Sequence, residues 1–171
     1  IHEFLEKFDE THPLIRAYAD GNVMMANNFR VKIPHKKTSF AILSDERYAH
    51  LFTATQLDLI ARHIPWTRRI RDDRTTYRGE KCDLLELIRR ERDSFLMKPH
   101  DDYGGHGVHF GWESTHSEWD TLIENALKGI FVVQERAPVD KTLIPTFDEE
   151  LTLQELTVDF DPFLFRGQIG R

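Results

Sequence analysis

Cysteine is nearly absent from this 171-residue sequence, because Cys82 is the only one. A single thiol cannot form a disulfide within the chain, and it cannot supply the several thiolates of a cysteine-based zinc site. This scarcity fits a reducing compartment, so we expect a cytoplasmic protein. Cys82 opens a leucine-rich stretch with no histidine paired to it in the local sequence, which disfavours a catalytic nucleophile.

Long apolar runs and dense basic blocks are also missing. No apolar stretch approaches the roughly 20 residues that a membrane-spanning helix needs, so we expect no membrane partner. The formal net charge is -6, and without a Lys/Arg block we expect no sequence-independent binding of nucleic acid. No signal peptide is visible. The sequence begins at Ile1 and stops in Gly170-Arg171, so we expect a fragment of a larger protein.

Several familiar site motifs are missing as well. None of the nine histidines shows the i, i+4 helical pairing of zinc hydrolases, so we expect no histidine metal centre. The glycines at 104, 105 and 107 are not followed by Lys-Ser/Thr, which excludes a Walker phosphate loop. They precede a strand-like segment, not a helix, which disfavours the dinucleotide-binding Gly-x-Gly-x-x-Gly motif.

What the sequence does contain is enough apolar material for a core, with 40% hydrophobic and 11% aromatic residues. Helical spacing is found over 1–10, 56–63, 82–92 and 119–127, with Thr55 and Ser117 as expected caps. Ser44 to Arg47 is typical of a helix start, with Leu51 and Phe52 on its buried side. Strands are expected at 23–26, 95–97, 108–110, 130–136 and 151–165. The order over 95–136 predicts an α+β fold with a small antiparallel sheet.

Lys98 is the first candidate site residue, because it ends an apolar strand just before the glycine-rich loop. Glycines at 104, 105 and 107 let backbone N–H groups approach a polyphosphate, and the lysine adds a positive charge beside it. The alternative is a plain β-hairpin whose glycines only satisfy positive φ angles.

Other candidates lie at strand ends and in turns. Glu135, in Gln134-Glu135-Arg136, could bond an adenine amino group or a ribose hydroxyl, or be an ordinary exposed strand end. Arg68 could contact a phosphate or form a salt bridge, whereas Trp66 is expected in the core or at a hinge. Asp159 and Asp161 alternate with apolar residues, so both could face one side of a strand and hold Mg²⁺, or simply face solvent.

The order of these features resembles the circularly permuted branch of the ATP-grasp family, which is related to glutathionylspermidine synthase-like ligases. The resemblance runs from about residue 27 to the end. Its five pieces, in order, are Lys36-Lys37 before Thr38–Leu43, Ile64–Arg68, Met97–Val108, Val132–Arg136 and Val158–Gly167. Their order is more specific than any one piece. Two positions depart from the family pattern, since His100 stands where Asn is common and His106 where Lys or Glu is common.

The resemblance implies a role for each matching residue. Lys37 and Lys98 would be the two nucleotide lysines, and the loop would close over the phosphates of ATP. Gln134 and Glu135 would lie at the adenine hinge. The remaining implied residues are Tyr103, Gly104, Gly105, His106 and Gly107 in the loop, Asp159 and Asp161 for the metal, and Arg171 near the terminal phosphate.

The resemblance also implies a domain layout and a reaction. Residues 31–171 would form an ATP-grasp-like nucleotide-binding domain, incomplete at its C-terminus, after a lead-in segment over 1–30. With ATP and Mg²⁺, the larger protein would join a small carboxylate or peptide-like substrate to an amine through an acyl phosphate. The alternatives are an ATP-grasp-like module that binds or scaffolds without catalysis, and an α+β domain that binds no nucleotide.

Overall fold

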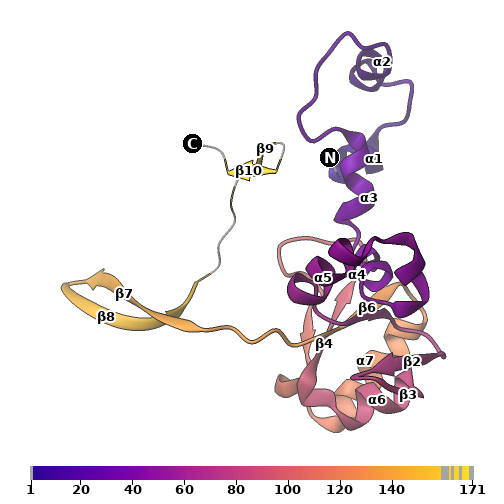
Figure 1. The fold of residues 1–171 in the computed structure, drawn as a ribbon. Helices are drawn as coiled ribbons and strands as arrows, with labels where there is room; N and C mark the ends of the chain where they lie inside the picture. The colour runs from indigo at the N-terminus through magenta and orange to yellow at the C-terminus, as the bar shows by residue number, and fades with distance from the viewer. Residues whose placement is uncertain (1, 159–161, 163, 166, 170–171) are drawn as a thin grey trace. The chain divides into compact units, whose positions relative to one another are not determined.

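A computed structural model of the protein describes residues 2–158, 162, 164–165 and 167–169. The chain divides into two compact units, residues 1–136 and residues 137–171. Small antiparallel sheets and flanking helices give the α+β architecture that the sequence predicts (Figure 1). In the described ranges, no helix has both the length and the apolar character to cross a membrane.

The first unit is built on a four-stranded antiparallel sheet with strand order β1-β6-β4-β5. Its strands are β1 (Thr67–Arg69), β6 (Phe131–Glu135), β4 (Phe95–Pro99) and β5 (His109–Phe110). Val132 lies between Arg69 and Lys98, and Gln134 lies between Thr67 and Leu96. Residues paired across antiparallel strands point to the same face, so these side chains share one face of the sheet.

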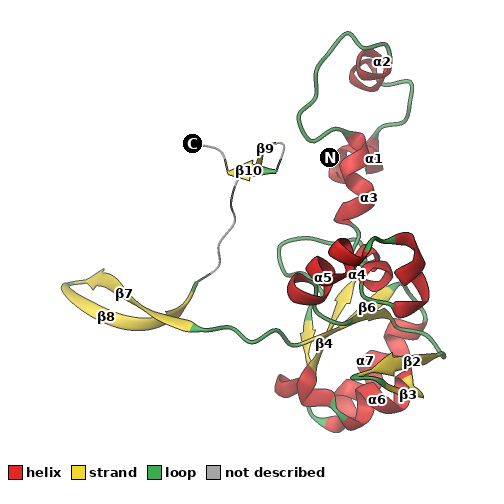
Figure 2. Ribbon diagram, viewed as in Figure 1, coloured by secondary structure: helices red, strands yellow, loops and turns green. Residues whose placement is uncertain are grey.

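The opposite face of the sheet carries the core. Phe95, Met97 and Val133 are completely buried and belong to one hydrophobic cluster with residues of α6 (Leu84–Arg90) and α7 (His116–Leu127). Trp119 of α7 joins the two helices, because its indole Nε1 donates to the Ile88 carbonyl over 2.8 Å. Figure 2 shows both helices on one side of the strands. Burying side chains of this size stabilises a fold by about 1.5–3 kcal/mol each.

The helices of the core begin at side-chain caps. Asp83 accepts from the Glu86 N–H at the start of α6. Thr115 and Glu118 form a reciprocal capping box at the start of α7. These side chains satisfy backbone donors that the first turn leaves unpaired.

The remaining elements of the first unit are short. A β-hairpin joins β2 (Arg74–Tyr77) to β3 (Glu80–Asp83). Of the N-terminal helices, α4 (Thr38–Leu43) contacts β1 and β6. The other N-terminal helices are α1 (His2–Lys7), α2 (Pro13–Ala19), η1 (Phe29–Val31), α3 (Lys32–His35), η2 (Glu46–Leu51) and α5 (Ala54–His63). Two further 3-10 helices, η3 (Arg92–Ser94) and η4 (Gly111–Glu113), lie next to β4 and β5 in the sequence.

The second unit consists of two β-hairpins in the residues described. The longer one pairs β7 (Lys141–Asp148) with β8 (Glu150–Thr157) around Glu149, which has φ 62°. The shorter one pairs β9 (Leu164–Phe165) with β10 (Gln168–Ile169). β8 and β9 account for the strands expected within 151–165. Asp159, Asp161 and Arg171 lie outside the described residues.

Several local predictions are wrong. Residues 23–26 are not a strand, and Met24 is 98% exposed, because no neighbouring strand pairs with this short run. Leu51 is 60% exposed, since η2 is a 3-10 helix whose side-chain spacing differs from that of an α-helix.

Other errors concern helix starts. Thr53 rather than Thr55 caps α5, through a capping box with Gln56, and Thr115 rather than Ser117 caps α7. In both cases the cap is the threonine that has Gln or Glu three residues later. Cys82 ends up in β3, because α6 begins only after the Asp83 cap.

Candidate functional site

Lys98 begins a chain of hydrogen bonds on one face of the four-stranded sheet. Its Nζ donates to Gln134 Oε1 over 2.9 Å. Gln134 Nε2 in turn donates to Thr67 Oγ1 over 3.0 Å, and that hydroxyl donates to the Pro65 carbonyl over 2.8 Å. Three strands therefore hold one half-buried ammonium group in place.

Lys37 approaches the same ammonium group from a different part of the chain. It precedes α4, and its backbone N–H donates to the His100 carbonyl over 2.8 Å. Its Nζ donates to the Asp102 carbonyl. Nearby, Asp101 pairs with Lys32 and, at 3.4 Å, with Lys36. These contacts tie the segment before α4 to the turn after β4.

The electrostatics of Lys98 are those of a cation without a counter-ion. Burial lowers the pKa of Lys98, and the positive charge of Lys37 lowers it further. Within the part of the chain that the structure describes, neither ammonium group lies within salt-bridge distance of a carboxylate. Two close, partly desolvated cations favour an anion between them, because an anion would offset the cost of both.

The loop over 103–107 joins β4 to β5 and is exposed. Gly104, Gly105 and Gly107 have φ values of 64°, 76° and 66°, a region that side chains with a Cβ rarely adopt. A Cβ at Gly107 would also lie only 3.0 Å from the Pro99 ring, so the ring would have to shift to admit it. The ring of Tyr103 packs edge-on against His106 at 6.2 Å. The loop thus closes a β-hairpin beside the lysines. This geometry is compatible both with a phosphate-binding loop and with a plain β-hairpin.

Glu135 lies on the other face of the sheet from Gln134, because successive residues of a strand alternate. Its Oε1 accepts from Tyr77 Oη over 2.8 Å and from Arg78 over 2.9 Å. Burial and the bond to Glu135 both raise the pKa of Tyr77. The structure therefore brings Lys37, Lys98 and Gln134 together and places Glu135 elsewhere.

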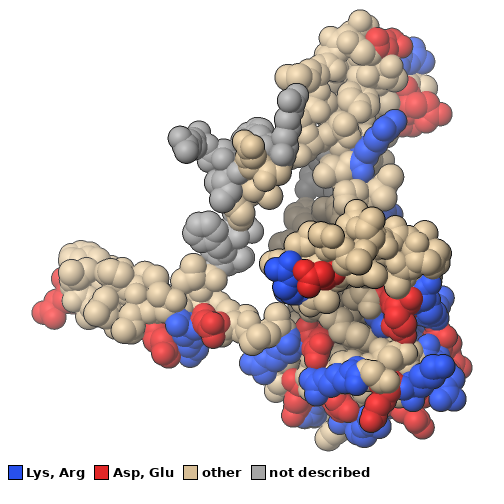
Figure 3. Space-filling model, viewed as in Figure 1, with Lys and Arg blue, Asp and Glu red and all other residues tan. Residues whose placement is uncertain are grey.

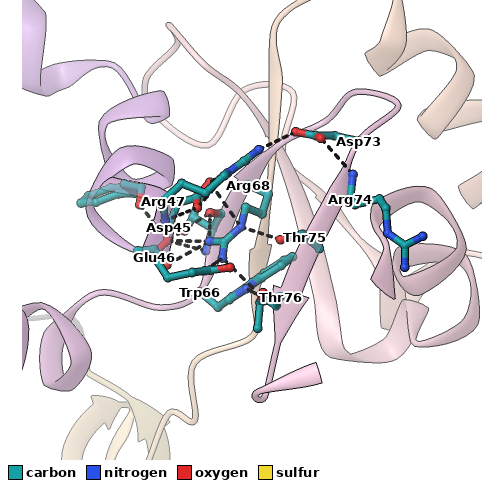
Figure 4. Close-up of polar contacts among 12 residues, drawn as sticks. Asp45, Glu46, Arg47, Trp66, Arg68, Asp73, Arg74, Thr75 and Thr76 are labelled. Atoms are coloured by element: carbon teal, nitrogen blue, oxygen red, sulfur yellow. Dashed lines mark hydrogen bonds and ion pairs between the residues drawn. The ribbon is translucent and has the colours of Figure 1, made fainter. Parts of the chain in front are cut away.

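Arg68 is a structural ion-pair partner, which decides between the two roles left open by the sequence. It is 3% exposed, and its guanidinium donates to Thr75 Oγ1 over 2.7 Å and to Glu46 over 2.9 Å (Figure 4). It also lies over the ring of Trp66, 4.6 Å from the centroid. Burial lowers the pKa of Arg68, while the charges of Asp45 and Glu46 oppose that shift. Trp66 packs against the core, as predicted.

Sequence reasoning missed Thr67, which orients the Gln134 amide. The only signal was its place in the segment Pro65-Trp66-Thr67-Arg68, where the aromatic and basic residues drew attention instead. Over the described ranges, no group of three or more His, Cys, Asp or Glu side chains could hold a metal ion. The residues predicted for Mg²⁺, Asp159 and Asp161, and the predicted Arg171 lie outside those ranges.

The surface charge of the first unit is mixed. Figure 3 shows Lys and Arg side chains interspersed with Asp and Glu side chains on the face that carries β2, β3 and α6. The pairing of Lys37 with Lys98 is therefore a local feature, and not part of a broad basic surface. No protein-family model, no curated protein and no solved structure matches this chain.

Proposed function

We propose that this chain is the ATP-binding part of an ATP-dependent carboxylate-amine ligase. The observation that carries the proposal is the meeting of Lys37 and Lys98 beside a glycine-rich hairpin loop, with no carboxylate of the described residues to neutralise them. The two lysines come from distant segments, and only a folded site brings them together. A polyphosphate fits such a site, because its charge is spread over several oxygens.

The reaction follows from the chemistry of phosphoryl transfer. A substrate carboxylate oxygen attacks the γ-phosphorus of ATP, the bond to the bridging oxygen breaks, and ADP leaves. The acyl phosphate is then attacked by an amine nitrogen, which loses a proton as inorganic phosphate departs and an amide bond forms. No protein nucleophile is required, so the protein's part is to position the reactants and to neutralise charge.

Each residue of the candidate site has a defined task in this scheme. Lys98 and Lys37 neutralise phosphate oxygens, and Gln134 holds the Lys98 ammonium in place. The backbone of the loop over 103–107 covers the phosphates. Mg²⁺, when bound, would add further charge neutralisation, and Asp159 and Asp161 are the residues proposed to hold it. Arg171 is proposed to approach the terminal phosphate.

Titration calorimetry with Mg·ATP tests the proposal. The Lys98→Met variant keeps the apolar stem and removes the charge, so the fold should be retained. We expect ATP affinity to fall at least about tenfold, which corresponds to about 1.4 kcal/mol. Lys128→Met removes an exposed lysine at the end of α7 and is the matched control.

The calorimetric outcomes separate the interpretations. Equal ATP affinity of the wild type and Lys98→Met, or no binding heat at all, would contradict the proposal. Binding that depends on Lys98, with no phosphate release in the presence of carboxylates and amines, would favour the non-catalytic binding module instead.

A further inference from the structure

A second basic site lies in a pocket of the first unit, between α4, η2, β1 and β2. The pocket has a volume of about 340 Å³. Six Lys or Arg side chains line it against two Asp side chains, although the whole chain is acidic. The six are Lys36, Arg47, Arg68, Arg69, Arg71 and Arg74. Lys98 does not line this pocket, so it is distinct from the lysine pair described above.

The acidic groups of the pocket are already engaged. Asp45 accepts from Arg47 over 2.6 Å and lies 3.8 Å from Arg68. Asp73 binds Arg47 over 3.0 Å and Arg71 over 2.7 Å. Figure 4 shows this network joining η2 to the β2 hairpin. The two carboxylates therefore pair with Arg47, Arg68 and Arg71 and with no other arginine side chain of the pocket.

Arg69 and Arg74 are the arginines without a partner. Both are exposed, and neither guanidinium has a hydrogen bond or an ion pair with any residue that the structure describes. In Figure 4 the Arg74 side chain extends away from the Asp73 carboxylate. Of Arg74, only the backbone N–H donates to that carboxylate. Both side chains line the pocket, and an anion bound there would be attracted by both positive charges.

The rest of the lining suits a small molecule with a charged end. Ala41, Ile42, Leu84 and Ile130 supply apolar surface, and Thr38 and Thr75 supply hydroxyl groups. His100 also lines the pocket, and burial together with the charge of Lys36 lowers its pKa. A hollow of this size that combines apolar walls with charged and hydroxyl groups can hold a small ligand and orient its charged end.

We propose that this pocket binds a small oxyanion carrying at least two negative charges, held by the guanidinium groups of Arg69 and Arg74. The planar fork of each arginine matches a carboxylate or a phosphate, so either chemistry fits. The site adjoins the candidate nucleotide site, since Arg69 and Lys98 flank Val132 on one sheet face. The proposal stands whether or not the neighbouring lysines bind ATP.

Calorimetric titration with inorganic pyrophosphate and, separately, with succinate tests the site and distinguishes the two chemistries. Acetate, with a single charge, serves as the reference ligand. We expect one of the two dianionic probes to bind with a Kd of about 1 mM or tighter and acetate to bind more weakly. Failure of both probes to bind would overturn the proposal.

Variants assign the binding to the pocket. The double variant Arg69→Gln/Arg74→Gln should weaken the probe at least about tenfold, because two charge-assisted contacts are lost. Arg89→Gln/Arg90→Gln removes two exposed arginines of α6 and should leave the affinity unchanged. Circular dichroism checks that both variants are folded.

Lys98→Met separates this proposal from the nucleotide site. It should leave probe binding intact, even if it abolishes ATP binding. Equal loss of probe affinity in Lys98→Met, or unchanged affinity in the Arg69/Arg74 double variant, would place the probe elsewhere and overturn the proposal.

Discussion

The four-stranded sheet and the β7–β8 hairpin are both antiparallel and both contain apolar residues, yet the sheet has completely buried side chains and the hairpin has none. Phe95, Met97 and Val133 of the sheet are 0% exposed. In the hairpin, Phe147 is 78% exposed and Leu151 is 73% exposed, although the two residues pair directly. The sheet is covered by α6 and α7, whereas in the described part of the second unit there is no helix.

Apolar content therefore predicts a strand but not a core. A strand is stabilised by its ladder of hydrogen bonds, while a core also needs an element that covers one face. The stability of the first unit should therefore depend on single buried side chains. The hairpin should be insensitive to similar changes.

Trp119→Ala should have the largest effect on this comparison. The side chain is 1% exposed and bonds the Ile88 carbonyl, so its removal leaves a cavity and an unpaired buried acceptor. We expect the free energy of unfolding to fall by about 3–5 kcal/mol. Urea denaturation followed by far-UV circular dichroism measures the change. A loss below about 1 kcal/mol would contradict the account of a single tightly packed core.

Asp45→Asn should have an intermediate effect, because it removes charge and not volume from the first unit. Asp45 is 4% exposed and accepts hydrogen bonds from Arg47 beside the buried Arg68. We expect a loss of about 1–3 kcal/mol at pH 7. Asp58→Asn, which changes an exposed pair on α5, should cost much less.

The effect of Asp45→Asn should also depend on pH. Burial alone would raise the pKa of Asp45, but hydrogen bonds from Arg47 and the charge of Arg68 outweigh it and hold the pKa below its ordinary value. Because the pKa is lower in the folded state, the ionised carboxylate stabilises the fold at pH values above the unfolded pKa of about 3.9. This contribution to stability is lost as the pH falls through the folded pKa. The difference between wild type and variant should therefore shrink below about pH 4. An unchanged difference at pH 3 would contradict this role of the carboxylate.

Phe147→Ala should have the smallest effect. Little apolar area is buried at this position, so we expect the free energy of unfolding to change by less than about 0.5 kcal/mol. Thermal denaturation of the whole protein is the measurement. A fall of several degrees in Tm would contradict the expected insensitivity of the hairpin, because it would mean that the face carrying Phe147 is covered in solution.

The sequence predicted regular elements well where several signals agreed. Over 95–136, apolar periodicity and glycine positions both pointed to strand, loop, strand, helix and strand, and the structure has that order. A single short apolar run, as at 23–26, gave a wrong strand because pairing depends on a partner that local sequence does not specify. Helix starts were misplaced where the reciprocal capping box was overlooked.

The candidate site was predictable only in part. The motif from Lys98 to Gly107 could be recognised from local sequence, because a strand end and the turn that follows it are adjacent in the chain. The placement of Lys37 beside Lys98, and of Thr67 under Gln134, depends on tertiary packing of α4 and β1. The arginine pocket could not be found from sequence, because the side chains of Arg47, Arg69 and Arg74 come from different elements.

Hydrogen exchange of backbone amides with and without saturating Mg·ATP tests the central claim most directly. The account predicts that the nucleotide slows exchange most strongly in residues 98–108, where Lys98 and the glycine loop would enclose the phosphates. In Lys98→Met, the same slowing should require at least about tenfold more Mg·ATP. Unchanged exchange in residues 98–108 at saturating Mg·ATP would contradict the account.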